Sequence, residues 1–88
     1  MYLHLGQNVV VPEASVIGVF DLDNTTGSHI TRKFLGAAEK ARRVISVSDD
    51  LPKSFVVCGA GSEMSIYLSQ LSSQTLLKRS EAMLYDQQ

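Results

Sequence analysis

Cations are concentrated in one part of the chain, between residues 29 and 43. This part holds five of the eight Lys and Arg residues and a single acidic residue, Glu39; the five are Arg32, Lys33, Lys40, Arg42 and Arg43. On a helical wheel, four of them (Arg42 is the exception) lie away from the apolar stripe that begins at Ile30. Arginine forks and lysine ammonium groups are the side chains that contact nucleic-acid phosphates. The pattern is typical of a solvated helix surface, and it also fits a phosphate-binding one, because such a surface is solvated when free.

A second candidate for chemistry is acidic. Asp21 and Asp23 follow an apolar run and lead into Asn24-Thr25. This Asp-x-Asp-x-Thr pattern resembles the first motif of the haloacid dehalogenase-type phosphatases. The resemblance would make Asp21 the nucleophile and Asp23 the general acid and base, both near a magnesium ion.

The rest of the chain does not supply what that chemistry needs. The phosphatase fold is a doubly wound parallel sheet, which requires several helical crossovers, and only one helix of that kind is predicted after the motif. The other acidic pair, Asp49-Asp50, lies between the strands predicted over residues 44–47 and 54–58, which is the wrong context for that motif. We therefore interpret the motif as a strand that ends in an acidic turn, and we expect no catalytic residue and no enzyme activity.

The remaining reactive side chains favour structural roles. His4 and His29 have no cysteine or carboxylate at ligand spacing, so neither a metal site nor a cofactor is expected. Cys58 lies in an apolar run and is predicted to be a buried, inert thiol. The Gly59-Ala60-Gly61 segment lacks the Gly-Lys-Ser/Thr of a phosphate loop and fits a hairpin better. Ser72 is expected to cap a helix.

Apolar periodicity predicts six strands and two helices. The strands are expected over residues 2–5, 9–11, 16–20 (extending as far as 22), 44–47, 54–58 and 64–69. One helix is expected from about 29 to 42, with Ser28 as its N-cap, and the other over 72–79. The buried stripe of the first helix is predicted to comprise Ile30, Phe34, Ala37, Ala38 and Ala41. The second helix is expected to close over the apolar side of the last hairpin, where Met64, Ile66 and Leu68 alternate with polar residues.

This order of elements predicts the α+β class: a small single domain with a mostly antiparallel sheet of about six strands, one central helix and one short C-terminal helix. The domain is expected to span residues 1–79, and residues 80–88 to form a polar tail that either continues the last helix or frays. Two helices cannot cover both faces of a six-stranded sheet. Apolar sheet surface is therefore expected to remain for a second copy, and the protein is predicted to form a homo-oligomer larger than a dimer.

Composition narrows the setting. A chain of 88 residues makes one domain, and its net charge of −1 gives no general attraction to nucleic acid or to acidic membranes. A nucleic-acid-binding protein of this charge must gather its cations on one surface. The single cysteine, the absence of a leader pattern and the lack of apolar runs of about 20 residues predict a cytoplasmic protein without a membrane span.

Four short blocks, taken in order, carry a family resemblance. They are YLHLG at residues 2–6, NVVVP at 8–12, LPKSFVV at 51–57 and LLKR at 76–79. Together they resemble the extracellular matrix regulatory proteins of spore-forming bacteria, in particular the B-type branch, over nearly the whole chain from Met1 to Arg79. The resemblance implies a small DNA-binding transcriptional regulator of the biofilm matrix, assembled into a ring-like homo-oligomer without catalysis.

The resemblance also implies where DNA contacts lie and where this chain departs from them. In the A-type branch, an arginine-rich run before the fifth strand contributes to DNA contact. The matching segment here, residues 49–53, keeps one cation, Lys53, beside two aspartates, and another A-type arginine falls near Ala14. The expected contacts to double-stranded DNA are Arg32, Lys33, Lys40, Arg43 and Lys53. The alternative is a non-catalytic oligomeric module that binds a partner, such as a paralogous regulator, without direct DNA binding.

Overall fold

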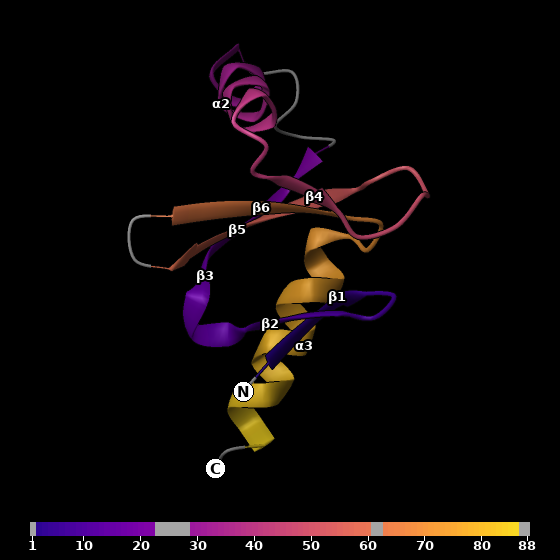
Figure 1. Cartoon of the computed structure of the whole chain (residues 1–88). Helices are drawn as coiled ribbons and strands as arrows, with labels where there is room; N and C mark the ends of the chain where they lie inside the picture. Colours follow the sequence, from indigo (N-terminus) through magenta and orange to yellow (C-terminus); the bar gives the residue numbers. More distant parts are fainter. Residues whose placement is uncertain (1, 23–28, 61–62, 87–88) are drawn as a thin grey trace.

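The computed structural model describes residues 2–22, 29–60 and 63–86, without the side chains at 29, 30, 60 and 81–86. Within these residues, six strands and two α-helices confirm the predicted α+β class (Figure 1). The strands are β1 (Tyr2–Gly6), β2 (Val9–Pro12), β3 (Val16–Asp21), β4 (Val44–Ser46), β5 (Ser54–Ala60) and β6 (Glu63–Ser69). The helices are α2 (His29–Lys40) and α3 (Ser73–Asp86), and a single 3₁₀ turn, η1 (Glu13–Ser15), joins β2 to β3.

The six strands divide into two sheets, whereas a single sheet was expected. β1 and β2 form a two-stranded antiparallel ribbon, and the other four strands form a sheet in the order β3-β5-β6-β4. All pairs are antiparallel except β4 with β6. Because β3 and β4 run in the same direction, the chain between them must cross over the sheet, and α2 belongs to that crossover.

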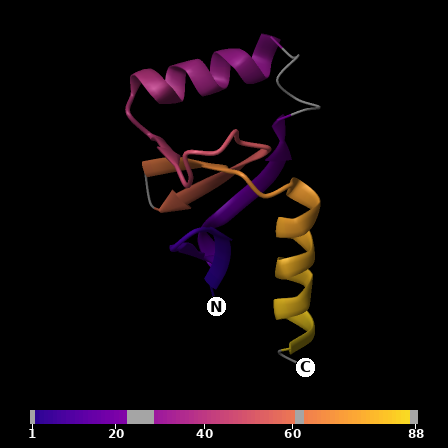
Figure 2. The same cartoon turned by 90° about the vertical axis from the view of Figure 1, so that its right-hand side faces the viewer.

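The central strand β5 explains how one sheet supports two cores. Its apolar run is buried on both sides, as expected for a strand covered on both faces. Phe55 and Val57 point toward α2, and Val56 and Cys58 point toward the β1–β2 ribbon. The sheet therefore lies between two layers, with α2 on one face and the ribbon on the other (Figure 2).

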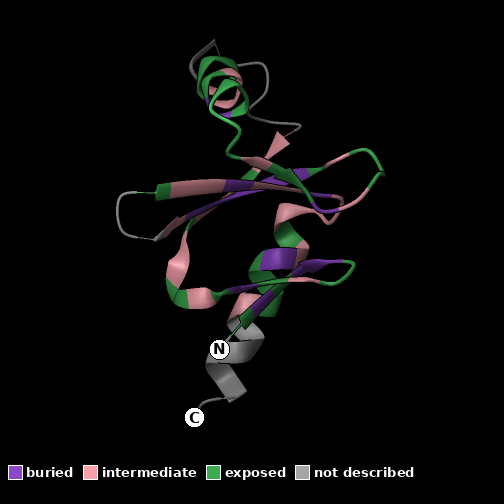
Figure 3. Cartoon of the chain, in the orientation of Figure 1, coloured by how far each residue is buried: buried purple, intermediate pink, exposed green. Residues whose placement is uncertain are grey.

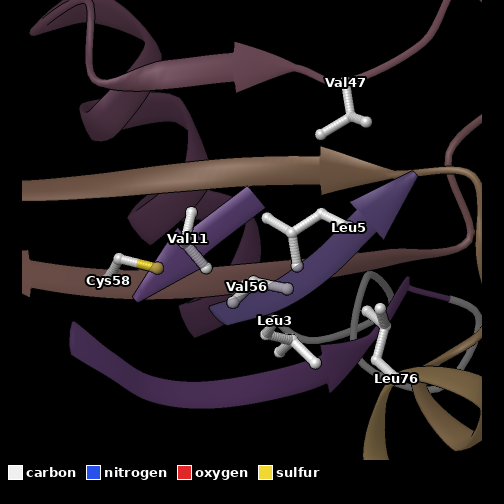
Figure 4. Close-up of a cluster of buried hydrophobic side chains, with 7 residues drawn as sticks. All are labelled: Leu3, Leu5, Val11, Val47, Val56, Cys58 and Leu76. Carbon is white, nitrogen blue, oxygen red and sulfur yellow. The ribbon is translucent and has the colours of Figure 1, made fainter. Parts of the chain in front are cut away.

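The core on the ribbon side joins residues far apart in sequence. Leu3, Leu5 and Val11 from the ribbon pack against the sheet residues Val56 and Cys58, and Leu76 of α3 completes the cluster with Val47 (Figure 4). The expectation that the second helix would close over Met64, Ile66 and Leu68 was wrong, because α3 packs beside β1 and β3 on the other face of the sheet. The face with Ile66 is covered by α2.

The core on the α2 side is smaller, and it corrects the predicted stripe of that helix. Ala38 is buried against Phe55, Val57 and Ile66, with Leu35 packed beside it. Phe34 was expected to be buried but is 38% exposed, and Ala37 and Ala41 are exposed as well. The side chain of Ile30 and the expected cap Ser28 lie outside the described residues. One flank of α2 therefore carries apolar side chains that no part of the described chain covers.

Hydrogen bonds of buried serines link the two sheets and hold the turn that leads into α3. Ser69 Oγ donates to the carbonyl of Leu5 at 2.6 Å and accepts from the Leu71 amide at 3.1 Å, and Ser54 Oγ donates to Leu71 O at 2.7 Å. Ser72 Oγ accepts from the Thr75 amide at 3.1 Å, which confirms its predicted role as a cap of α3. The helix continues to Asp86, through most of the segment predicted to be a tail. In the described part of the chain, neither helix is long and apolar enough to span a membrane.

Candidate nucleic-acid interface

The outer surface of α2 carries three of the five predicted DNA contacts. Arg32, Lys33 and Lys40 are all exposed, and Figure 3 shows that the outer surface of α2 is largely exposed. Helical spacing puts Lys33 and Lys40 opposite the buried Ala38, with Arg32 to one side of them. They lie within about 100° of one another around the helix axis and span about 12 Å along it. That length matches three to four nucleotide steps of a DNA strand, at about 3.4 Å each. Among the residues that the structure describes, no ion pair engages these three side chains.

The helix ends in a turn that places two further arginines beside it. The Arg43 amide donates to Ala38 O at 2.9 Å and the Arg42 amide donates to Glu39 O at 3.0 Å, which is the hydrogen-bond pattern of a Schellman motif. Arg42 occupies the left-handed position, with φ of 59°, where glycine is the usual residue. An arginine at this position costs backbone energy relative to glycine.

Arg42 and Arg43 line a polar hollow at the end of α2. The hollow has a volume of about 350 Å³ and is also lined by Ile45 of β4 and by Glu63, Met64 and Ser65 of β6. Both arginines are exposed. The hollow can therefore receive an anionic group, and among the described residues that line it Glu63 is the one acidic side chain.

Lys53, the fifth predicted contact, lies apart from the others. Its amide donates to Ser69 O at 2.8 Å, whereas Arg43 O accepts from the Ile66 amide. Ser69 and Ile66, the two β6 residues in these hydrogen bonds, are three residues apart along the strand, which is about 10 Å. Lys53 is the last residue of the loop between β4 and β5, in which Asp49, Asp50 and Leu51 are all exposed. The structure thus brings Arg32, Lys33 and Lys40 together, puts Arg43 at the end of their helix, and separates Lys53 from them.

An apolar groove lies beside α2 on the flank that carries Phe34. It has a volume of about 380 Å³, and its lining includes Ile17, Phe20, Thr31, Phe34, Phe55 and Met64. Phe20 stacks on Phe55 with ring centroids 5.0 Å apart, yet Phe20 is still 41% exposed. Gly18 makes room for this ring, because a Cβ there would lie 2.8 Å from its carbons. Sequence reasoning predicted uncovered apolar surface but not this place; the signal was Phe34 in a stripe that was assumed to be buried.

The acidic motif has a structural environment that differs from a phosphatase site. Asp21 ends β3, an edge strand that pairs antiparallel with β5, so the parallel sheet of that fold is not present. The Asp21 carboxylate accepts a hydrogen bond of 3.5 Å from Ser73 Oγ, in the first turn of α3. Asp23, the second carboxylate of the motif, lies outside the described residues. Asp21 thus joins the edge of the sheet to the start of α3, where a negative charge is favourable.

Cys58 is buried in the ribbon-side core, as predicted. Burial raises the pKa of its thiol, although a hydrogen bond with Ser15 acts in the opposite direction. A protonated, enclosed thiol is a poor nucleophile. In the described parts of the chain, no group of three or more His, Cys, Asp and Glu side chains is placed to hold a metal ion.

The protein is a small α+β domain. Its exposed cations, its polar hollow and its apolar groove lie on open surfaces around α2. No family model matches the chain. It is 37% identical over 83 residues to extracellular matrix regulatory protein B of Bacillus subtilis (strain 168), and the match covers 94% of each chain. The chain therefore belongs to the family of that extracellular matrix regulatory protein.

Proposed function

We propose that this protein is a DNA-associated transcriptional regulator that acts as a ring-like homo-oligomer and contacts DNA phosphates through the outer surface of α2. The observation that carries the proposal is the set of exposed cations on that surface, Arg32, Lys33 and Lys40, which engage no acidic partner within the described residues. Residues 29–43 hold five cations and one acidic residue, a local charge of +4 in a chain of net charge −1. Family membership agrees with a regulatory role.

The physical basis is the electrostatic attraction between these cations and the DNA backbone. Each neutralised phosphate releases counterions, so binding weakens with salt at a slope of about −0.9 per phosphate contact. Three cations on one copy give weak binding with little sequence preference. An oligomer that presents several α2 surfaces to one duplex gains affinity through linked contacts, without any new chemistry. If six to ten phosphates are engaged in total, affinity falls by about 10³–10⁵ between 50 and 200 mM salt.

The test is binding of the intact protein to a labelled DNA duplex across that salt range, with the oligomer mass checked by light scattering. Lys33→Ala and Lys40→Ala should each reduce the salt slope and leave the mass unchanged. The matched control is Lys78→Ala, which removes the same charge from an exposed position on α3. The proposal fails if the oligomer shows no salt-dependent binding at 50 mM, or if Lys78→Ala lowers the slope as much as the α2 variants do.

A second candidate function is a partner-binding module that does not touch DNA. It is favoured by Asp49 and Asp50, which are exposed in the segment where the A-type branch carries arginines and which bring negative charge toward any phosphate nearby. In that case the partner would bind in the apolar groove, and a paralogous regulator is the expected partner. A wild-type oligomer that ignores DNA but co-purifies with such a paralogue, and loses it when Phe34 is replaced by Ser, would support this function.

A further inference from the structure

The apolar groove beside α2 is too open to be a finished binding site for a small molecule. Ile17 lines it and is 66% exposed, and Phe20 and Phe34 are also exposed at its rim. A small ligand at the bottom of the groove would leave these three side chains in water. A macromolecular surface would cover them, since exposed apolar patches of this kind mark protein contacts.

The groove continues into a cationic surface. Met64 lines both the apolar groove and the polar hollow that holds Arg42 and Arg43. The exposed alanines Ala37 and Ala41 lie on the same flank of α2 as Phe34. The combined surface is therefore complementary to a partner that carries a large apolar side chain next to negatively charged groups.

The chain itself carries such a segment, in the loop between β4 and β5. Leu51 is 86% exposed, more than any other large apolar side chain described. Asp49 and Asp50, both exposed, directly precede it. Among the described residues, neither aspartate has an ion-pair partner.

The loop and the groove lie on opposite flanks of α2. Pro52, next to Leu51, lines a hollow with Leu35 and Glu39, which belong to the other flank of the helix from Phe34. A copy cannot therefore fill its own groove with its own loop. The same placement lets the loop of one copy meet the groove of the next.

We propose that Leu51 of one copy inserts into the apolar groove of a second copy, while its Asp49 and Asp50 pair with Arg42 and Arg43 at the end of that copy's α2. The contact is head-to-tail, so each copy offers a loop on one side and a groove on the other, and repetition closes into a ring or continues as a filament. This inference rests on the proposed self-assembly and specifies its interface. It also gives the two aspartates a role away from DNA.

The first test is oligomer mass by size exclusion with light scattering, comparing Leu51→Lys with Leu77→Lys. Leu77 is a suitable control, because it is half exposed on α3 and belongs to neither surface. Leu51→Lys should reduce the mass toward the 9.6 kDa of one copy, while Leu77→Lys should keep the wild-type mass. Equal masses for Leu51→Lys and wild type would overturn the proposal.

The second test exchanges the charges. Asp49→Arg/Asp50→Arg and Arg42→Asp/Arg43→Asp should each dissociate, because each variant meets like charge at the contact. An equal mixture of the two should reassemble, since the basic loop of one variant meets the acidic hollow of the other. Aspartate tolerates the left-handed position of residue 42, so the second variant is expected to fold. A mixture that stays dissociated contradicts the charge pairing.

The third test traps the contact. Ile17→Cys and Leu51→Cys proteins, mixed and oxidised, should form a disulfide between the two variants. Disulfides within the Ile17→Cys protein alone would instead indicate a groove-to-groove dimer and refute the head-to-tail contact. If the wild-type protein is a monomer, both the proposed homo-oligomer and this interface are refuted. If the wild-type protein is an oligomer that none of these changes affects, only the proposed interface is refuted.

Discussion

Two adjacent leucines of α3 have opposite environments, and this permits a sharp test of how the helix is seated. Leu76 is fully buried, at 0% exposure, in the cluster with Leu3, Leu5 and Val11. Leu77 is 50% exposed. Replacing either with alanine changes the intrinsic helix propensity by the same amount, so the difference between the two variants measures burial alone.

The expected magnitudes differ several-fold. Truncation of a buried leucine to alanine costs about 2.7–5 kcal/mol, through lost transfer energy and the cavity left behind. Truncation of the half-exposed Leu77 should stay within about 1 kcal/mol. For a domain of this size each kcal/mol lowers the melting temperature by about 4–8 °C, so Leu76→Ala should melt at least ~10 °C below wild type. A small domain has total stability near the low end of about 5–15 kcal/mol, and Leu76→Ala should leave little of it.

The assay is urea and thermal unfolding followed by far-UV circular dichroism, at one protein concentration because self-association couples stability to concentration. The two variants should show similar urea slopes and different midpoints. Equal destabilisation by Leu76→Ala and Leu77→Ala would refute the docking of α3 against the β1–β2 ribbon.

Three further predictions follow from single positions. Gly36→Ala should stabilise the protein by about 0.5–1 kcal/mol in the same unfolding assay, because a Cβ there meets nothing within 4 Å and α2 loses an entropic cost; a loss of stability would mean that a partner packs on this position. Gly6→Ala should destabilise by roughly 1–3 kcal/mol, because Gly6 has φ of 120° and a Cβ would lie 2.7 Å from Gln70 Oε1; an unchanged midpoint would contradict this turn geometry. The wild-type protein should not hydrolyse p-nitrophenyl phosphate with magnesium; turnover that is lost in Asp21→Asn would re-establish the phosphatase interpretation of the acidic motif.

Local sequence patterns were sufficient to predict the strands and helices themselves. The apolar run at residues 55–58 marked a strand buried on both faces, and β5 is such a strand. The serine at 72 marked the start of α3, and its hydroxyl caps that helix. These features depend on periodicity and on hydrogen bonds between near neighbours, both of which are visible in sequence.

The division of the strands into two sheets and the faces on which the helices pack depend on long-range contacts. Local sequence patterns do not contain this information. Leu3 and Leu5 alternate with polar residues as any half-buried strand does, and nothing in that alternation says that they pack on Val56 and Leu76 instead of extending one sheet. Likewise, the apolar stripe of α2 predicted burial of Phe34, yet Phe34 is 38% exposed, because amphipathicity alone does not say which part of a stripe the chain covers. The same ambiguity makes the exposed Phe34 informative.

The predicted DNA contacts were chosen by charge, and the structure separates them by position. Arg32, Lys33 and Lys40 face outward from α2, where a long, flat polyanion can reach them. Arg42 and Arg43 sit in a hollow that shares Met64 with an apolar groove, a combination suited to an acidic loop with a leucine. If the two groups act separately, changes on the outer surface of α2 alter the salt slope at constant mass. Changes in the hollow alter the mass first and lose DNA affinity only as a consequence, because linked contacts vanish when the copies separate. Net charge does not reveal this arrangement: three of the eight cations lie on α2 and two more directly follow it. The proposed contact between copies places Asp49 and Asp50 against the Arg42 and Arg43 of a neighbouring copy.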